Sequence, residues 1–160
     1  MANFNFISVK IADLNTAVSP DILRTVLGSC IGICLYDHEK RIGGLSHIML
    51  PSSDDDNAIK EKYADTAIPL LMEKMEKLGA DKKSITAKIV GGATMFKISV
   101  ESLIGNIGNR NAEMVRKVLK DHKIKLTAEE VGGDYARTID FFLESGLVKI
   151  KSPNKIIKII

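Results

Sequence analysis

Short apolar runs recur along the chain at lengths typical of strands. The segment 13–20 between the first two of them is polar and predicts a connection rather than a strand. Two glycine-containing segments, 132–134 and 144–146, predict hairpin turns. The expected strands cover residues 5–11, 23–27, 31–36, 42–50, 85–90, 126–131, 135–143, 147–151 and 156–160.

Two other segments repeat apolar residues at helical spacing. Residues 62–78 predict one amphipathic helix, and Pro69 requires that the regular part begins close to it or that the helix bends there. Residues 112–122 predict a second helix, with Asn109 or Asn111 as its N-cap. Strands and helices in this order indicate an α/β fold, in which a mixed, many-stranded sheet carries two principal helices packed on it as a layered sandwich.

The size and composition of the chain predict a single domain spanning residues 1–160. With 45% apolar and 27% charged residues, the chain has an ordinary globular composition. Its net charge is only +3 and it lacks tryptophan, which argues against nucleic-acid binding. No apolar run is long enough for a membrane span, and the first residues do not resemble a signal peptide. We therefore expect a cytoplasmic protein with reduced thiols.

Two reactive side chains stand out within the apolar runs. Cys30 precedes the run 31–36, and His47 lies inside the run 42–50. A thiol becomes a strong nucleophile when a nearby base removes its proton, and His47 is a candidate for that base. Gly28 and Ser29 favour a tight turn whose N–H groups point outward, as an oxyanion site requires. The alternative is that both are ordinary core residues, since free cysteine and lone histidine are often buried.

Five sequence blocks, read in order, extend this interpretation. They are Leu27-Gly28-Ser29-Cys30, Ser46-His47-Ile48-Met49-Leu50-Pro51, Lys62-Tyr63-Ala64-Asp65-Thr66-Ala67, Gly91-Gly92-Ala93-Thr94-Met95-Phe96 and Asn106-Ile107-Gly108-Asn109-Arg110-Asn111. Together they resemble the chemoreceptor glutamine deamidases, the CheD family, over residues 25–137. The resemblance implies an α/β sandwich and the hydrolysis of receptor glutamine side chains to glutamate, with Cys30 as nucleophile and His47 as base.

The resemblance also implies a threonine that orients the histidine. Thr25 is the candidate, although the segment from Thr25 to Gly28 is one residue shorter than the commoner form of the family. A hydroxyl or carbonyl at Thr25 would accept a hydrogen bond from the imidazole and fix its tautomer. The alternative is an ordinary β-branched strand residue.

Paired glycines occur at two further places. Gly43 and Gly44 predict a bulge or a close backbone contact beside the His47 segment. Gly91 and Gly92 follow a strand, and we expect them, with Ser29, to line the pocket that receives the substrate. Phe96 would then offer the substrate an apolar contact. A simple turn at 91–92 is the alternative, and the phosphate-binding glycine patterns are absent there.

The resemblance implies partners as well. The substrate would be the cytoplasmic helices of a methyl-accepting chemotaxis receptor, and a CheC-type phosphatase would bind the protein as a regulator. Two alternatives are a catalytically weak adaptor for such a phosphatase or receptor, and a thiol amidohydrolase acting on free glutamine or small amides. We expect no cofactor and no metal, since the acidic segment 52–57 lacks the ligand spacing of a calcium loop.

Overall fold

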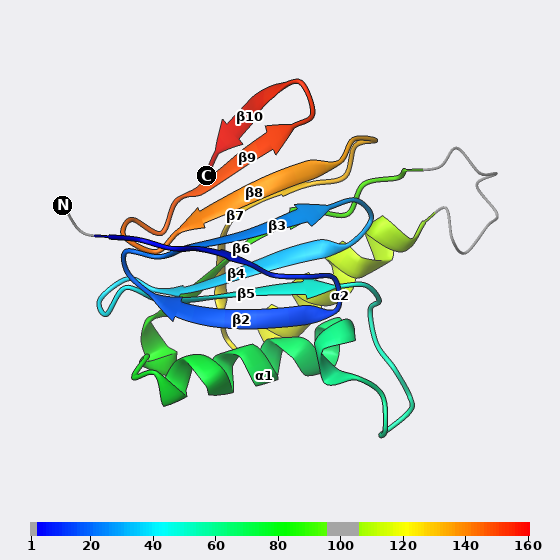
Figure 1. The fold of residues 1–160 in the computed structure, drawn as a ribbon. Coiled ribbons are helices and arrows are strands. Elements are labelled where there is room, and N and C mark those ends of the chain that lie inside the picture. Colours follow the sequence, from blue (N-terminus) through cyan, green and yellow to red (C-terminus); the bar gives the residue numbers. More distant parts are fainter. Residues whose placement is uncertain (1–2, 96–105) are drawn as a thin grey trace.

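The computed structural model describes residues 3–95 and 106–160. Within these ranges the chain forms ten strands and two α-helices, which Figure 1 traces from the N- to the C-terminus. The helices are α1 (Ala64–Lys77) and α2 (Ile107–Asp121). The strands are β1 (Phe6–Ser8), β2 (Asp13–Val18), β3 (Ile22–Leu27), β4 (Ile31–Asp37), β5 (Ile42–Ile48), β6 (Ile85–Gly91), β7 (Lys125–Val131), β8 (Arg137–Phe142), β9 (Val148–Ser152) and β10 (Lys155–Ile159).

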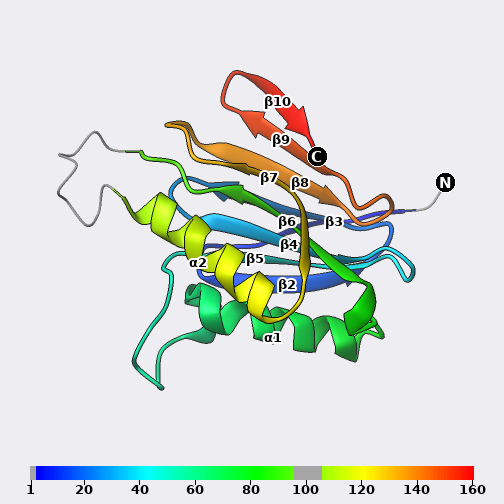
Figure 2. The same cartoon turned by 180° about the vertical axis from the view of Figure 1, so that it is seen from behind.

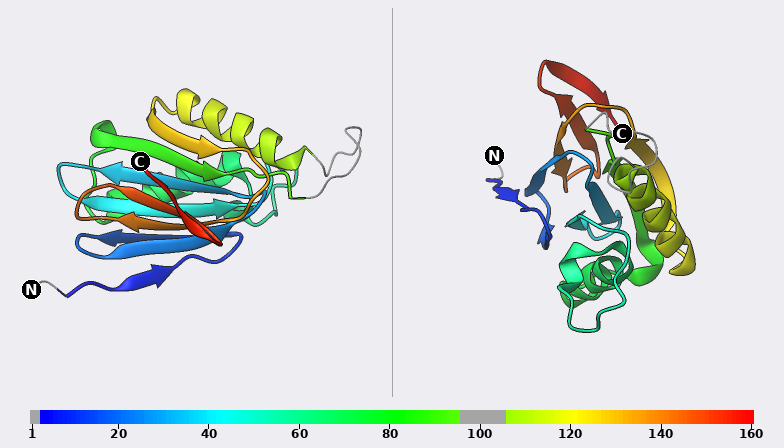
Figure 3. Two further views of the ribbon diagram at one scale, coloured as in Figure 1. Left: turned by 90° about the horizontal axis from the view of Figure 1, so that it is seen from above. Right: turned by 90° about the vertical axis from the view of Figure 1, so that its right-hand side faces the viewer.

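The strands divide between two mixed sheets. The central sheet has the order β2-β5-β4-β6-β7, and the outer sheet has the order β1-β3-β8-β9-β10. Both helices cover one face of the central sheet, as the view from behind and the side view show, and the outer sheet covers the other face (Figures 2 and 3). The α/β sandwich with two packed helices is therefore confirmed, and its sheet component consists of two sheets.

Strand β4 connects the two hydrophobic cores because its alternate side chains point in opposite directions. Ile31, Ile33 and Leu35 belong to the core beneath the helices. Cys34 and Tyr36 belong to the core between the sheets. Every residue of β4 is buried, as expected for a strand in the middle of three layers.

The paired glycines of β5 are sites of close approach, one on each face. A Cβ on Gly43 would lie 2.3 Å from a methyl carbon of Leu143, on the outer-sheet side. A Cβ on Gly44 would lie 2.6 Å from a methyl carbon of Leu71 in α1. The same alternation points Leu45 and His47 toward the outer sheet, and Leu45 belongs to the core between the sheets.

Three expectations about individual elements are wrong. Residues 13–18 form strand β2 at the edge of the central sheet, where only Leu14 and Ala17 are buried. Residues 132–134 join β7 to β8 in the other sheet, so they form a corner instead of a hairpin turn. Helix α2 begins earlier than expected, with Asn106 as its N-cap, which leaves Asn109 and Asn111 inside the helix.

Pro69 lies inside α1, which has Tyr63 as its N-cap, so the proline is beyond the first turn. The turn at 144–146 does join two neighbouring antiparallel strands, β8 and β9, as expected for a hairpin. Within the described residues, no helix is both long enough and apolar enough to span a membrane.

The fold predicts that Gly44→Ala destabilises the protein, because the added methyl group has no room beside Leu71. Overpacking of this kind costs about 1–3 kcal/mol, which urea unfolding can measure. Adding Leu71→Ala makes room, so the double variant should lose less stability than the sum of the two single changes. Losses that add to within about 0.5 kcal/mol would contradict the proposed contact.

Candidate active site

An open groove of about 680 Å³ lies at the end of the molecule where β3 turns into β4. Among its lining residues are five that the sequence singled out, Thr25, Gly28, Ser29, Cys30 and His47. Three of them are largely covered: Cys30 is 9% exposed, and Thr25 and His47 are each 4% exposed. The reactive side chains therefore lie at the floor of the groove.

The side chains of Thr25 and His47 meet across the space between the two sheets. Thr25 shares a face of β3 with Leu23 and Leu27, which belong to the core between the sheets. His47 reaches this space from the opposite side, from β5 of the central sheet. The Thr25 hydroxyl oxygen lies 2.8 Å from His47 Nδ1.

A second hydrogen bond determines the direction of the first. The Thr25 hydroxyl donates its single hydrogen to the carbonyl oxygen of Val9, at 2.7 Å. Its oxygen is then the acceptor for His47, so Nδ1 carries the imidazole proton. Nε2 is left with a free lone pair, which is the form of histidine that can remove a proton from a thiol.

The backbone of the Gly28–Cys30 turn is fixed by hydrogen bonds to its carbonyl groups. Three successive carbonyl groups accept hydrogen bonds: Gly28 from the N–H of Ala93 at 3.0 Å, Ser29 from the side chain of Asn111 at 3.2 Å, and Cys30 from the N–H of Gly92 at 2.9 Å. Within the described part of the chain, the N–H groups of these three turn residues donate no hydrogen bond to another residue. The Cys30 N–H interacts with the sulfur of its own side chain.

Gly91 and Gly92 support this turn and are not among the residues that line the groove. Gly91 has a φ of +116°, and a Cβ there would lie 2.2 Å from the carbonyl oxygen of Cys30. Gly92 has a φ of +66° and would meet the backbone of Gly108 at 2.9 Å. Both positions thus need glycine for conformation and for close approach.

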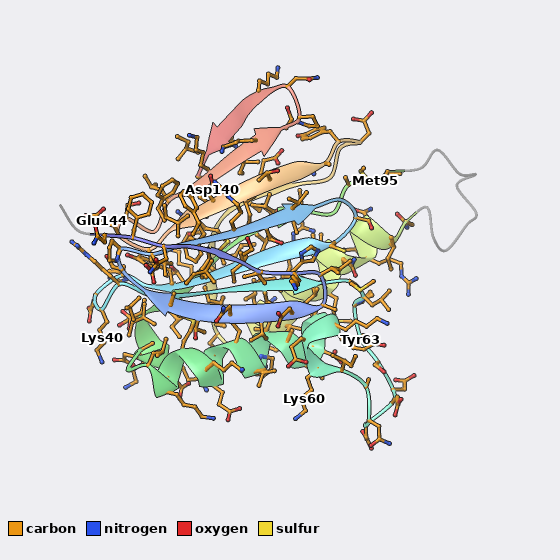
Figure 4. All side chains as sticks on the ribbon, viewed as in Figure 1. Lys40, Lys60, Tyr63, Met95, Asp140 and Glu144 are labelled. Atoms are coloured by element: carbon orange, nitrogen blue, oxygen red, sulfur yellow. The ribbon has the colours of Figure 1, made fainter. Side chains whose placement is uncertain are left out.

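The rim of the groove carries exposed apolar side chains next to the charged Lys10 and Arg24. Ile11, Val26 and Met95 line it and are 55%, 62% and 42% exposed. The Met95 side chain also lies beside Gly28, where a Cβ would be 3.4 Å from it. Figure 4 labels Met95, which lies at the same end of the molecule as the β3–β4 connection. Exposed apolar side chains around a covered reactive centre indicate a contact surface for another molecule.

Comparison with known proteins identifies the family to which this chain belongs. The family described as "CheD chemotactic sensory transduction" matches residues 49–152. A protein of Clostridium novyi (strain NT) is 52% identical over 94% of both chains, and its name is "Probable chemoreceptor glutamine deamidase CheD". A protein of the same name from Clostridium botulinum (strain Hall) is 54% identical over 91% of this chain and 92% of its own. The chain belongs to the CheD family.

The surroundings of this CheD-family site shift the acidity of both reactive groups. Burial raises the pKa of the Cys30 thiol, and the Cys30 backbone N–H, which interacts with the sulfur, opposes that change. Burial lowers the pKa of His47 to about 4. At neutral pH the two groups are therefore a neutral thiol and a neutral imidazole.

The residues expected to contact the substrate differ in where the structure places them. Ser29 lines the groove, whereas Gly91 and Gly92 do not. The expected contact of these three residues with the substrate stays a prediction. Phe96 lies outside the described residues. Val9 and Ile11 also line the groove and are not among the site residues predicted from the sequence, although apolar residues next to a strand end are a signal for a binding rim.

The acidities predict how Cys30 reacts with iodoacetamide. Because the thiol is neutral at pH 7, its alkylation rate should rise steadily between about pH 7 and 9 as thiolate forms. Mass spectrometry of the peptides measures this rate, and the fully buried Cys34 serves as an internal control that should stay unmodified. A rate that is already constant below pH 7 would indicate a resting thiolate–imidazolium pair and would contradict this account.

Proposed function

We propose that this CheD-family protein is a protein-glutamine deamidase, which hydrolyses glutamine side-chain amides of chemotaxis receptors to glutamate and ammonia in the cytoplasm. The observation that carries the proposal is the covered floor of the groove, where Cys30 and a histidine with an oriented imidazole line the same space. The names of the relatives supply the substrate class.

In the first step, His47 Nε2 accepts the thiol proton of Cys30. The sulfur then attacks the amide carbon of the glutamine side chain and forms a tetrahedral intermediate. Thr25 holds the imidazole in the tautomer that this step requires, and it also stabilises the proton on Nδ1 when the ring becomes positively charged.

The negative oxygen of the intermediate needs hydrogen-bond donors. The N–H groups of Ser29 and Cys30 are assigned this role because they belong to the turn whose carbonyl groups are held on the other side. Each donor of this kind contributes about 10²–10³ in rate. His47 then protonates the departing ammonia, and it activates a water molecule that hydrolyses the thioester and regenerates the thiol.

The shape of the groove favours a protein substrate. The thiol is almost covered, so a slender side chain such as glutamine has to extend from a surface that rests on the rim. Ile11, Val26 and Met95 supply that apolar rim. A receptor helix with small or apolar residues next to its glutamine would cover these side chains on binding.

The same rim is compatible with an adaptor that binds a CheC-type phosphatase or a receptor without deamidating it. The oriented His47 and the turn whose carbonyl groups are held on one side favour the enzyme, because an adaptor needs neither. Free glutamine as a substrate would leave the apolar rim without a partner.

We expect wild-type protein to release ammonia from a glutamine-bearing receptor fragment. The mass of the fragment should increase by the difference between glutamine and glutamate. Cys30→Ala should abolish both signals, whereas Cys34→Ala, which removes a buried thiol that does not line the groove, should keep them. Free glutamine should not be hydrolysed. Tight receptor binding with no mass change in wild type would support the adaptor instead, and full activity of Cys30→Ala would refute the mechanism.

A further inference from the structure

Asn111 is a polar side chain that the proposed mechanism leaves without a task. It lies in α2 and is completely buried. Its Nδ2 donates two hydrogen bonds, to the carbonyl oxygen of Ser29 at 3.2 Å and to that of Met49 at 2.9 Å. Since both partners are acceptors, the nitrogen of the amide has to face them.

The two bonds join the two segments that carry the reactive groups. Ser29 directly precedes Cys30, and Met49 follows the strand β5 that holds His47. The Oδ1 atom of Asn111 is buried without a hydrogen-bond partner among the described residues. A buried oxygen without a hydrogen-bond partner lowers stability, so the presence of an asparagine at this position needs a physical explanation.

The geometry of the Ser29–Cys30 peptide bond explains the role of Asn111. The Ser29–Cys30 peptide bond is trans, so its C=O and its N–H point in opposite directions. Asn111 holds the C=O on the side of α2, which turns the Cys30 N–H away from the helix. The donated hydrogen bond also polarises the peptide unit and strengthens its N–H as a donor.

We propose that Asn111 is a positioning residue, which fixes the Ser29–Cys30 peptide so that the Cys30 N–H faces the oxyanion of the reaction. It does not touch the substrate and acts through the backbone of the turn. The inference rests on the proposed deamidase function, because it assigns a cause to the oxyanion donor used there.

The first test replaces Asn111 with alanine and uses Asn109→Ala, an exposed position on the same helix, as the matched control. We expect Asn111→Ala to lower kcat by roughly 10- to 100-fold with little change in KM, because one oxyanion donor is misdirected rather than removed. Alkylation of Cys30 by iodoacetamide should change little, since displacement of iodide forms no oxyanion. Equal losses in both reactions, or no loss of kcat, would overturn the proposal.

A second readout does not depend on turnover. A receptor peptide with an aldehyde in place of the glutamine amide adds to the thiol and places its oxygen at the oxyanion position. Its affinity for Asn111→Ala should fall by about the same factor as kcat, and its affinity for Asn109→Ala should not change. Undiminished affinity would overturn the role of Asn111, whereas a wild type that binds the aldehyde but releases no ammonia would overturn only the deamidase proposal.

Asn111→Asp keeps the shape of the side chain and provides a variant if alanine does not fold. The neutral carboxyl group donates one hydrogen bond, and the ionised group donates none. The rate of Asn111→Asp relative to wild type should therefore fall as the pH rises. A ratio that is independent of pH would contradict the requirement for a donor at this position.

Discussion

The hydrogen bond between Thr25 and His47 joins the two sheets at the candidate site. Thr25 belongs to the outer sheet and His47 to the central sheet, so the bond exists only when the two sheets pack in one register. A shift of one residue in either strand would turn its side chain to the opposite face. The close contacts at Gly43 and Gly44 oppose such shifts, which ties the imidazole to the packing of all three layers.

The turn that carries Cys30 depends on a second set of constraints. Its three carbonyl groups are bound by Gly92, Ala93 and Asn111, which follow β6 or lie in α2. The backbone there is so crowded that a side chain at Gly91 would strike the Cys30 carbonyl. A rigid turn with its carbonyl groups held on one side keeps its N–H groups oriented before a substrate arrives, and such preorganisation is the main source of oxyanion stabilisation.

Much of this arrangement was predictable from local patterns. The strands around Cys30 and His47 are apolar runs of the right length, and the paired glycines of β5 do mark close contacts. Strand β2 was missed because an edge strand with only two buried residues resembles a polar connection. For Asn111 the sequence predicts only a helix N-cap, because nothing local shows that its side chain reaches a carbonyl 82 positions earlier. The division into two sheets likewise depends on contacts distant in sequence.

Thr25 fixes the imidazole of His47 with its proton on Nδ1, and every other feature of the candidate site depends on this orientation. Nitrogen-15 NMR of protein labelled at histidine distinguishes the two neutral tautomers, and His38 and His122 provide reference signals outside the groove. The account predicts that His47 is neutral at pH 7 with Nδ1 protonated, and that Thr25→Val weakens this preference while Thr25→Ser retains it. A His47 ring protonated on Nε2, or one whose tautomer is the same in Thr25→Val, would contradict the account.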